Sequence, residues 1–268
     1  MKQRKKKNNG PLRGKAVLVT RPGSQSGSMK KMLEKMGARV FNLPVIQIVE
    51  PEDWGPFDEA LKQIKRYHWM ILTSVNGVRG VLQRLHALGR DLHYLDHVRI
   101  AAIGEATAFA LTESGRRPDL VPGQFTSEGL LEAFREKDWV RGRNFLLPRA
   151  DIAPGYLAEE LERHGGCVTQ VTAYRTVFPK PTRTSLNKLE TLLKERKIDY
   201  ITLTSASTVS GFFDLLPGRF KKKVPSRFVT IGPVTSEALR RYGHEPYREA
   251  KTHTVNGLIK ALTASPTA

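Results

Sequence analysis

The sequence feature that most constrains this fold is an internal repeat, in which the second half of the chain echoes the first. Residues 14–21 read GKAVLVTR and residues 142–149 read GRNFLLPR, at an offset of 128. Further matching segments are IGEAT at 103–107 with IGPVT at 231–235, at the same offset, and ILTS at 71–74 with TLTS at 202–205, at an offset of 131. A near-constant offset over most of the chain indicates two copies of one unit, with a period far too long for a solenoid.

Each copy alternates short apolar runs with helical patterns. Residues 16–19 (AVLV) predict a buried strand, and Met29, Leu33 and Met36 then recur at helical spacing before Gly37 ends the helix. Strand, polar loop and helix in this order, with short loops, predict parallel sheets covered by helices. The predicted fold class is therefore α/β, with two similar parallel-sheet domains.

Two related segments are predicted to cross between the two halves. Gly37–Ile48 (GARVFNLPVIQI) and Gly165–Phe178 (GGCVTQVTAYRTVF) both continue from a helix exit into a strand rich in β-branched residues. Sequential domains would break near residues 139–142. Interlaced domains would instead have the chain leave the first domain early and return late through these two strands. The sequence pattern leaves both arrangements open.

The net charge of +18 in 268 residues indicates an acidic partner. The first fifteen residues contribute seven of these charges, and we expect residues 1–14 to form a disordered basic tail without a specific partner. The remaining +11 favours polyanions, either nucleic acid or a small molecule with many carboxylates. Few aromatic residues are interleaved with the basic ones, which argues against nucleic acid.

Several signals are missing from the sequence, and their absence bears on the cellular compartment and on metal binding. No apolar run is long enough to span a membrane, and no apolar core follows the basic start, so we expect a cytoplasmic protein. The single cysteine, Cys167, excludes an internal disulfide and any cysteine-based metal cluster. The seven histidines cluster only loosely, so no metal site is predicted.

Hydroxyl and glycine residues recur where a predicted strand gives way to a helix. Such turns lie at the carboxyl ends of the strands, where free helix amides and the helix dipole attract carboxylate or phosphate groups. These hydroxyl residues can also be plain helix caps, but their recurrence in both copies favours a binding cleft. The candidate substrate-binding residues of this kind are Ser74, Gly104, Thr107, Ser205, Gly232 and Thr235.

Two arginines and a tyrosine complete the candidate site. Arg21 and Arg149 occupy matching positions after a strand, where a guanidinium can clamp a carboxylate through two hydrogen bonds. Simple solvation at the surface is the competing interpretation for both. Tyr174 lies on the second crossing segment, and its phenol is either catalytic or an aromatic anchor packed on that crossing.

Taken in order, these motifs resemble those of the uroporphyrinogen-III synthase family. The resemblance runs from about Lys15 to Leu262. Its segments are VLVTRP at 17–22, LTS at 72–74, IGEATA at 103–108, SEGL at 127–130, AYRT at 173–176, LTS at 203–205 and IGPVT at 231–235. The chain departs from the family pattern at Val234, where a second threonine is common, and in its lysine-rich tail.

The resemblance implies the interlaced arrangement, with two α/β domains joined by a two-stranded antiparallel hinge. The chain would start and end in domain 1, formed by residues 15–43 and 176–268, and domain 2 would span residues 49–170. The hinge strands would be residues 43–48 and 170–176. A monomer is expected.

The resemblance also implies a reaction, the cyclisation of the linear tetrapyrrole hydroxymethylbilane to uroporphyrinogen III with loss of water and inversion of ring D. That family uses no cofactor, and its substrate carries eight carboxylates. Tyr174 maps onto the tyrosine thought to assist departure of the substrate hydroxyl, and Ser74, Thr107, Ser205 and Thr235 map onto positions lining the cleft. Transient contact with neighbouring enzymes of tetrapyrrole biosynthesis is compatible with this role, whereas a membrane partner is not expected.

Two other functions compete with this one. A non-enzymatic two-domain protein that closes on an anionic ligand would use the same hinge and cleft. A nucleic-acid binder would instead work through the basic tail and body, against the sparse aromatic content noted above.

Overall fold

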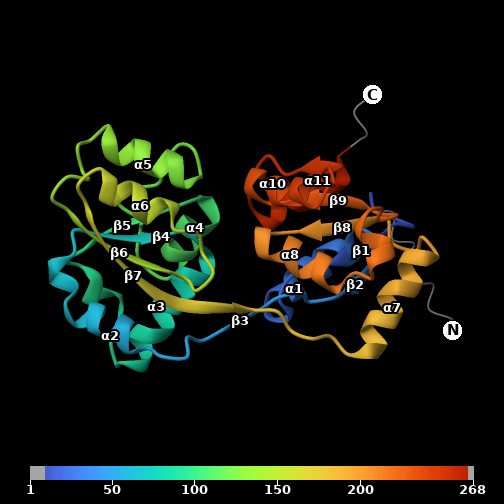
Figure 1. The fold of residues 1–268 in the computed structure, drawn as a ribbon, viewed down its shortest axis with the longest axis horizontal. Coiled ribbons are helices and arrows are strands. Elements are labelled where there is room, and N and C mark those ends of the chain that lie inside the picture. Colours follow the sequence, from blue (N-terminus) through green and yellow to red (C-terminus); the bar gives the residue numbers. More distant parts are fainter. Residues whose placement is uncertain (1–9, 265–268) are drawn as a thin grey trace, which may run out of the picture. The chain divides into compact units, whose positions relative to one another are not determined.

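The computed structural model describes residues 10–264, which form two compact units (Figure 1). Unit 1 combines the described residues up to Gln47 with those from Val177 onward, and unit 2 spans Ile48–Thr176. Within the described range, no helix is long and apolar enough to cross a membrane.

Unit 1 is built on a five-stranded sheet in the order β10-β9-β8-β1-β2, and every neighbouring pair is parallel. Its strands are β1 (Ala16–Val19), β2 (Arg39–Asn42), β8 (Tyr200–Leu203), β9 (Arg227–Thr230) and β10 (Arg248–Glu249). Its helices are α1 (Gly23–Lys35), α7 (Arg183–Lys194), α8 (Ala206–Leu215), α9 (Gly218–Lys221), α10 (Pro233–Arg241) and α11 (Val255–Thr263). Leu18 packs with residues of α7 and α8, whereas Val17 and Val19 pack with α1 and α11. The strand alternation thus buries both faces of the sheet.

Unit 2 has a sheet in the order β3-β7-β6-β4-β5, in which the pairs β7-β6, β6-β4 and β4-β5 are parallel. Its strands are β3 (Gln47–Val49), β4 (Trp69–Leu72), β5 (Arg99–Ala102), β6 (Asn144–Ala150) and β7 (Cys167–Val177). Its helices are α2 (Gly55–Lys62), α3 (Val75–Ala87), α4 (Glu105–Glu113), α5 (Ser127–Arg135) and α6 (Tyr156–Arg163), with 3-10 turns at Ile64–Arg66 and Leu92–Leu95. Figure 1 shows α2 and α3 on one side of this sheet and α5 and α6 on the other. A mixed α/β fold with parallel sheets is thereby confirmed.

Both sheets draw strands from both copies of the repeat. The first copy supplies β1 and β2 to unit 1 and β3, β4 and β5 to unit 2, and the second copy supplies the remaining strands of each. The correspondence extends to single residue pairs, since the isolated parallel bridge Ala101–Leu120 in unit 2 matches the β9–β10 pair Val229–Arg248 in unit 1 at an offset of 128. Each unit is therefore a composite of the two copies.

The first crossing segment differs from the single strand predicted over Gly37–Ile48. Strand β2 ends at Asn42 and β3 begins at Gln47, and they belong to different sheets. Pro44 lies in the interruption, where it has no N–H group to donate to a neighbouring strand. The second crossing segment does form the predicted strand, as the eleven residues of β7.

The predicted basic tail, residues 1–14, falls partly outside the described residues, which begin at 10. Residues 11–14 form a turn. The Leu12 side chain is buried against α1 residues of unit 1, and its backbone N–H donates to the carbonyl of Met36 at 3.0 Å. This part of the predicted tail therefore belongs to the folded unit, because the Leu12 side chain is part of its core.

Candidate functional site

The side chains of Tyr174 and Ser74 meet in unit 2, a hundred residues apart in sequence. The phenolic oxygen of Tyr174, on β7, lies 3.0 Å from the Oγ of Ser74. Ser74 is the N-cap of α3, and its Oγ also accepts a hydrogen bond from the backbone N–H of Gly77 at 3.1 Å. The hydroxyl proton of Ser74 thus remains available for the phenolic oxygen. Two residues predicted separately form one hydrogen-bonded pair.

The phenol of Tyr174 is held in its protonated form. Burial raises its pKa, and the negative charge of Asp151 raises it further, while the hydrogen bond from Ser74 and the positive charge of Arg149 act in the opposite direction. Burial dominates, because a phenolate loses more solvation than a phenol does. At neutral pH this side chain therefore carries its proton.

Arg149 lies on β6 beside Tyr174, and the alternative of simple solvation at the surface is wrong for this residue. Its side chain is buried, and its guanidinium donates to the side-chain oxygen of Gln170 and, at 2.5 Å, to the carbonyl of Pro154. Burial lowers the pKa of Arg149, and its interaction with Tyr174 raises it. The geometry supports an internal cation that links β6 to β7 and acts electrostatically on the phenol.

Asp151, which is not among the predicted site residues, fixes the backbone around Tyr174. Its carboxylate accepts a hydrogen bond from the backbone N–H of Thr176 at 3.0 Å, and its own N–H donates to the carbonyl of Tyr174 at 3.3 Å. The carboxylate also lies 3.7 Å from the Nε of Arg175, whose Nη1 contacts Glu52 at 2.5 Å. Its position was the sequence signal that could have identified it, since Asp151 directly follows β6, the strand that carries Arg149.

The hydroxyl residues predicted at the helix N-termini include confirmed caps. Ser205 caps α8 and accepts from the N–H of Thr208, in the same way as Ser74 caps α3. Thr107 and Thr235 are buried in the first turns of α4 and α10, where their N–H groups donate to the carbonyls of Gly104 and Gly232 at 3.2 and 3.1 Å. The capping interpretation thus holds for Ser74 and Ser205, and binding by these turns stays a prediction.

The predicted residues divide between the units. Unit 2 contains Ser74, Gly104, Thr107, Arg149 and Tyr174, and unit 1 contains Arg21, Ser205, Gly232 and Thr235. Arg21 follows β1 as predicted, and its Nη2 donates to the Oε1 of Gln25 in α1 at 2.9 Å. In unit 2, Tyr174 is hydrogen-bonded to Ser74 and interacts electrostatically with Arg149.

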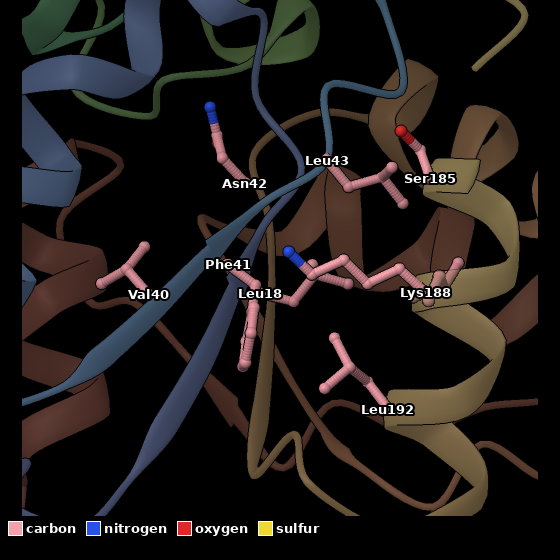
Figure 2. Close-up of a pocket in the computed structure, with 9 residues that line it drawn as sticks. Leu18, Val40, Phe41, Asn42, Leu43, Ser185, Lys188 and Leu192 are labelled. Carbon is pink, nitrogen blue, oxygen red and sulfur yellow. The ribbon is translucent and has the colours of Figure 1, made fainter. Parts of the chain in front are cut away.

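A pocket of about 200 Å³ lies elsewhere in unit 1, between β2 and α7 (Figure 2). Its lining is partly apolar, with polar groups from Asn42, Ser185 and Lys188. Figure 2 shows Lys188 reaching from α7 toward Leu18 and Phe41, and its Nζ lies 6.0 Å from the centre of the Phe41 ring. None of the predicted site residues lines this pocket.

Comparisons with known proteins agree with these motifs over most of the chain. The family model described as uroporphyrinogen-III synthase HemD matches residues 27–260. A uroporphyrinogen-III synthase from Synechococcus elongatus is 31% identical over 258 residues, which cover 94% of this chain and 96% of the relative. Crystal structures of uroporphyrinogen III synthases share the fold. The Thermus thermophilus protein has a TM-score of 0.67 at 22% identity, and the superposition covers 92% of this chain and 97% of the Thermus chain. The Helicobacter pylori protein has a TM-score of 0.61 at 16% identity, with 92% and 97% covered.

Proposed function

Since this chain belongs to the uroporphyrinogen-III synthase family, we infer that it cyclises hydroxymethylbilane to uroporphyrinogen III, with loss of water and inversion of ring D. The observation that carries this function is the family match over residues 27–260, together with a protonated tyrosine held by a serine hydroxyl within it. The reaction is that of a hydro-lyase in tetrapyrrole biosynthesis. The alternative of a binding protein that returns its ligand unchanged is not favoured by relatives named as synthases.

We propose that Tyr174 is the acid that assists departure of the substrate hydroxyl. The phenol would give its proton to the hydroxyl oxygen as the carbon–oxygen bond breaks, so that water leaves and an electrophilic methylene carbon remains on the tetrapyrrole. The hydroxyl of Ser74, 3.0 Å away, can donate to the phenolate that forms. Attack by the substituted carbon of ring D, which has no proton to lose, would be followed by breakage of the bond from that carbon to its original methylene bridge. The freed methylene would then be attacked by the unsubstituted carbon of ring D, and the proton lost from that carbon would restore the acid. Such positioned proton transfer contributes roughly 10²- to 10⁴-fold in rate.

The specific part of the reaction is the choice of carbon that attacks. The electrophile can close by itself to the uninverted isomer, so the protein has to hold the chain with ring D presenting its substituted carbon. This is a task of orientation, which fixed binding groups perform without strong acid–base motifs. Accordingly, we propose that the helix N-termini at Ser74, Gly104, Thr107, Ser205, Gly232 and Thr235, with Arg21, bind the substrate carboxylates.

We further propose that the two units are the domains implied by the family resemblance, joined by an antiparallel hinge over residues 43–48 and 170–176. The chain passes between the units next to Gln47 and Thr176, and β3 and β7 are neighbours in the sheet of unit 2, which supports this assignment. A monomer in the cytoplasm, with no macromolecular partner required for catalysis, completes the proposal.

The product isomer tests the function directly. The purified chain is incubated with hydroxymethylbilane, the products are oxidised, and the type I and type III uroporphyrins are separated and quantified. Predominantly type III product is expected, against type I in a blank without protein. Type I alone in both samples would remove the synthase activity and leave a fold that binds without converting.

A further inference from the structure

Tyr174 packs on one face of the unit 2 sheet, whereas regular alternation along β7 would place it on the opposite face. In a regular strand, successive side chains point to opposite faces. Val171 and Ala173 of β7 pack into the core that contains α3, whereas Val168 packs into the core on the other face. Tyr174, an even-numbered position like Val168, nevertheless packs against the α3 core. Ala173 and Tyr174 are therefore consecutive residues on the same face.

A bulge in β7 accounts for this change of face. Arg149 of β6 pairs with Thr172, but the next residue, Ala150, pairs with Tyr174, so that Ala173 is one extra residue on β7. Bulges insert an unpaired residue, bend the strand and redirect the side chain that follows. Without this extra residue, the phenol would point to the opposite face of the sheet from Ser74.

Gly80 of α3 lies directly against the bulge. A Cβ atom built on Gly80 would come closer than 3.0 Å to the carbonyl oxygen of Ala173, a separation that real side chains do not adopt, and would lie 3.2 Å from the Ala173 Cβ. Gly80 is buried in the same helix that Ser74 caps. The absence of a side chain at this position lets the capped helix and the bulged strand approach closely.

We propose that Gly80 is a positioning residue, which admits the Ala173 bulge against α3 and thereby holds the Tyr174 phenol at Ser74. The inference rests on the proposed role of Tyr174 as the acid. Any side chain at Gly80 pushes β7 away from α3, so the phenol and the serine separate. Misplacement of a reacting group by about 1 Å can cost about 10²-fold in rate.

The repeat contains a natural comparison in unit 1. Gly211 of α8 is the counterpart of Gly80 at an offset of 131, and a Cβ built there would lie 2.7 Å from the carbonyl oxygen of Val45, the counterpart of Ala173. The counterpart of Tyr174 is Ile46, which is buried. A helix glycine thus lies close to a carbonyl oxygen in both units, but only in unit 2 is the residue after that carbonyl a tyrosine.

The test compares Gly80→Ala with Gly129→Ala in the full-length chain. Gly129 lies on α5 of the same unit, and a Cβ there would also come closer than 3.0 Å to a carbonyl oxygen, that of Gln124. The variants are compared in steady-state kinetics with hydroxymethylbilane, in urea unfolding, and in spectrophotometric titration of the phenols, with Tyr174→Phe made in each background to isolate Tyr174. A gentler second variant, Ala173→Ser, crowds the same contact if Gly80→Ala does not fold.

We expect Gly80→Ala to lower kcat by roughly 10- to 100-fold at a KM within about twofold, and to move the titration of Tyr174. Ala173→Ser should give smaller changes of the same kind, whereas Gly129→Ala should lose stability without changing either readout. An unchanged kcat and titration in a destabilised Gly80→Ala would reduce Gly80 to a packing residue. A wild-type chain that makes no type III product would instead overturn the proposed function, and the titration would still report on the placement of Tyr174.

Discussion

At the scale of single residues, the phenolic proton of Tyr174 is the group whose removal should be most informative. In Tyr174→Phe, the ring stays packed but the acid is lost, so we expect kcat to fall by about 10²-fold with KM nearly unchanged. Activity should not vanish, because the binding groups still orient the substrate and the hydroxyl can leave slowly unaided. The measurement is the initial rate of type III formation over a range of hydroxymethylbilane concentrations. Full activity in this variant would remove Tyr174 from the mechanism.

The raised pKa of Tyr174 also makes stability depend on alkaline pH. The folded state keeps the phenolic proton at pH values where an unfolded tyrosine, with a pKa of about 10, has lost it. Through this group, the free energy of unfolding should therefore not vary with pH below pH ~10, and it should decrease as the pH rises from there through the folded pKa. Urea unfolding of the wild type and of Tyr174→Phe across this range gives the contribution as a difference. Parallel curves would show that the phenol titrates normally.

Ser74 should combine a capping role with a tuning role. Ser74→Ala removes the acceptor for the N–H of Gly77, at a cost of about 1 kcal/mol in the free energy of unfolding, and also removes the hydrogen bond that lowers the pKa of Tyr174. Thr126→Ala is the matched control, because Thr126 caps α5 by accepting from the N–H of Gly129 at 3.1 Å. Both variants should lose similar stability, but only Ser74→Ala should raise the pKa of Tyr174. If Tyr174 titrated at the same pH in both variants, Ser74 would act only as a helix cap and would not influence the phenol.

At the scale of elements, the entry into α4 depends on a backbone conformation that only glycine adopts readily. Gly104 has φ +90° and ψ 149° at the N-cap of this helix. An alanine there should cost about 1–3 kcal/mol in the free energy of unfolding, because its Cβ clashes with the backbone in this region. Gly123→Ala is the control, since that glycine lies in an open loop of the same unit with nothing within 4 Å of an added Cβ. Comparable urea midpoints for the two variants would contradict the strain argument.

Most strands and helices were predictable from the sequence, because a helical spacing such as that of Met29 and Leu33 depends only on the local pattern. The repeat gave the same prediction twice. Other features depended on contacts between distant segments. Residues Arg21 and Arg149 are equivalent in sequence, yet Arg149 is buried by Gln170 and Pro154, a partnership invisible in the pattern. The bulge at Ala173 likewise has no local signature, because it exists only in the pairing of β7 with β6.

At the scale of the whole molecule, the charge balance should govern substrate capture. The chain carries a net charge of +18, and the proposed substrate carries eight carboxylates, so their attraction should weaken as salt screens it. We expect KM for hydroxymethylbilane to rise severalfold between about 20 and 300 mM NaCl, with kcat at saturating substrate within about twofold. Sucrose at matched osmolality serves as the control for solvent effects. A KM independent of salt would show that the net charge plays no part in binding.

The sharing of both sheets between the two copies has a consequence for the origin of the chain. A polypeptide cut between the copies, near residues 139–142, would leave each sheet with strands on both fragments, so neither fragment could complete a fold by itself. Two molecules of a single ancestral copy could satisfy the same pairing by exchanging their crossing segments. Gene duplication and fusion of such a strand-exchanged dimer would produce the present connectivity, and would have allowed the two copies to diverge, with isoleucine at position 46 and tyrosine at the equivalent position 174.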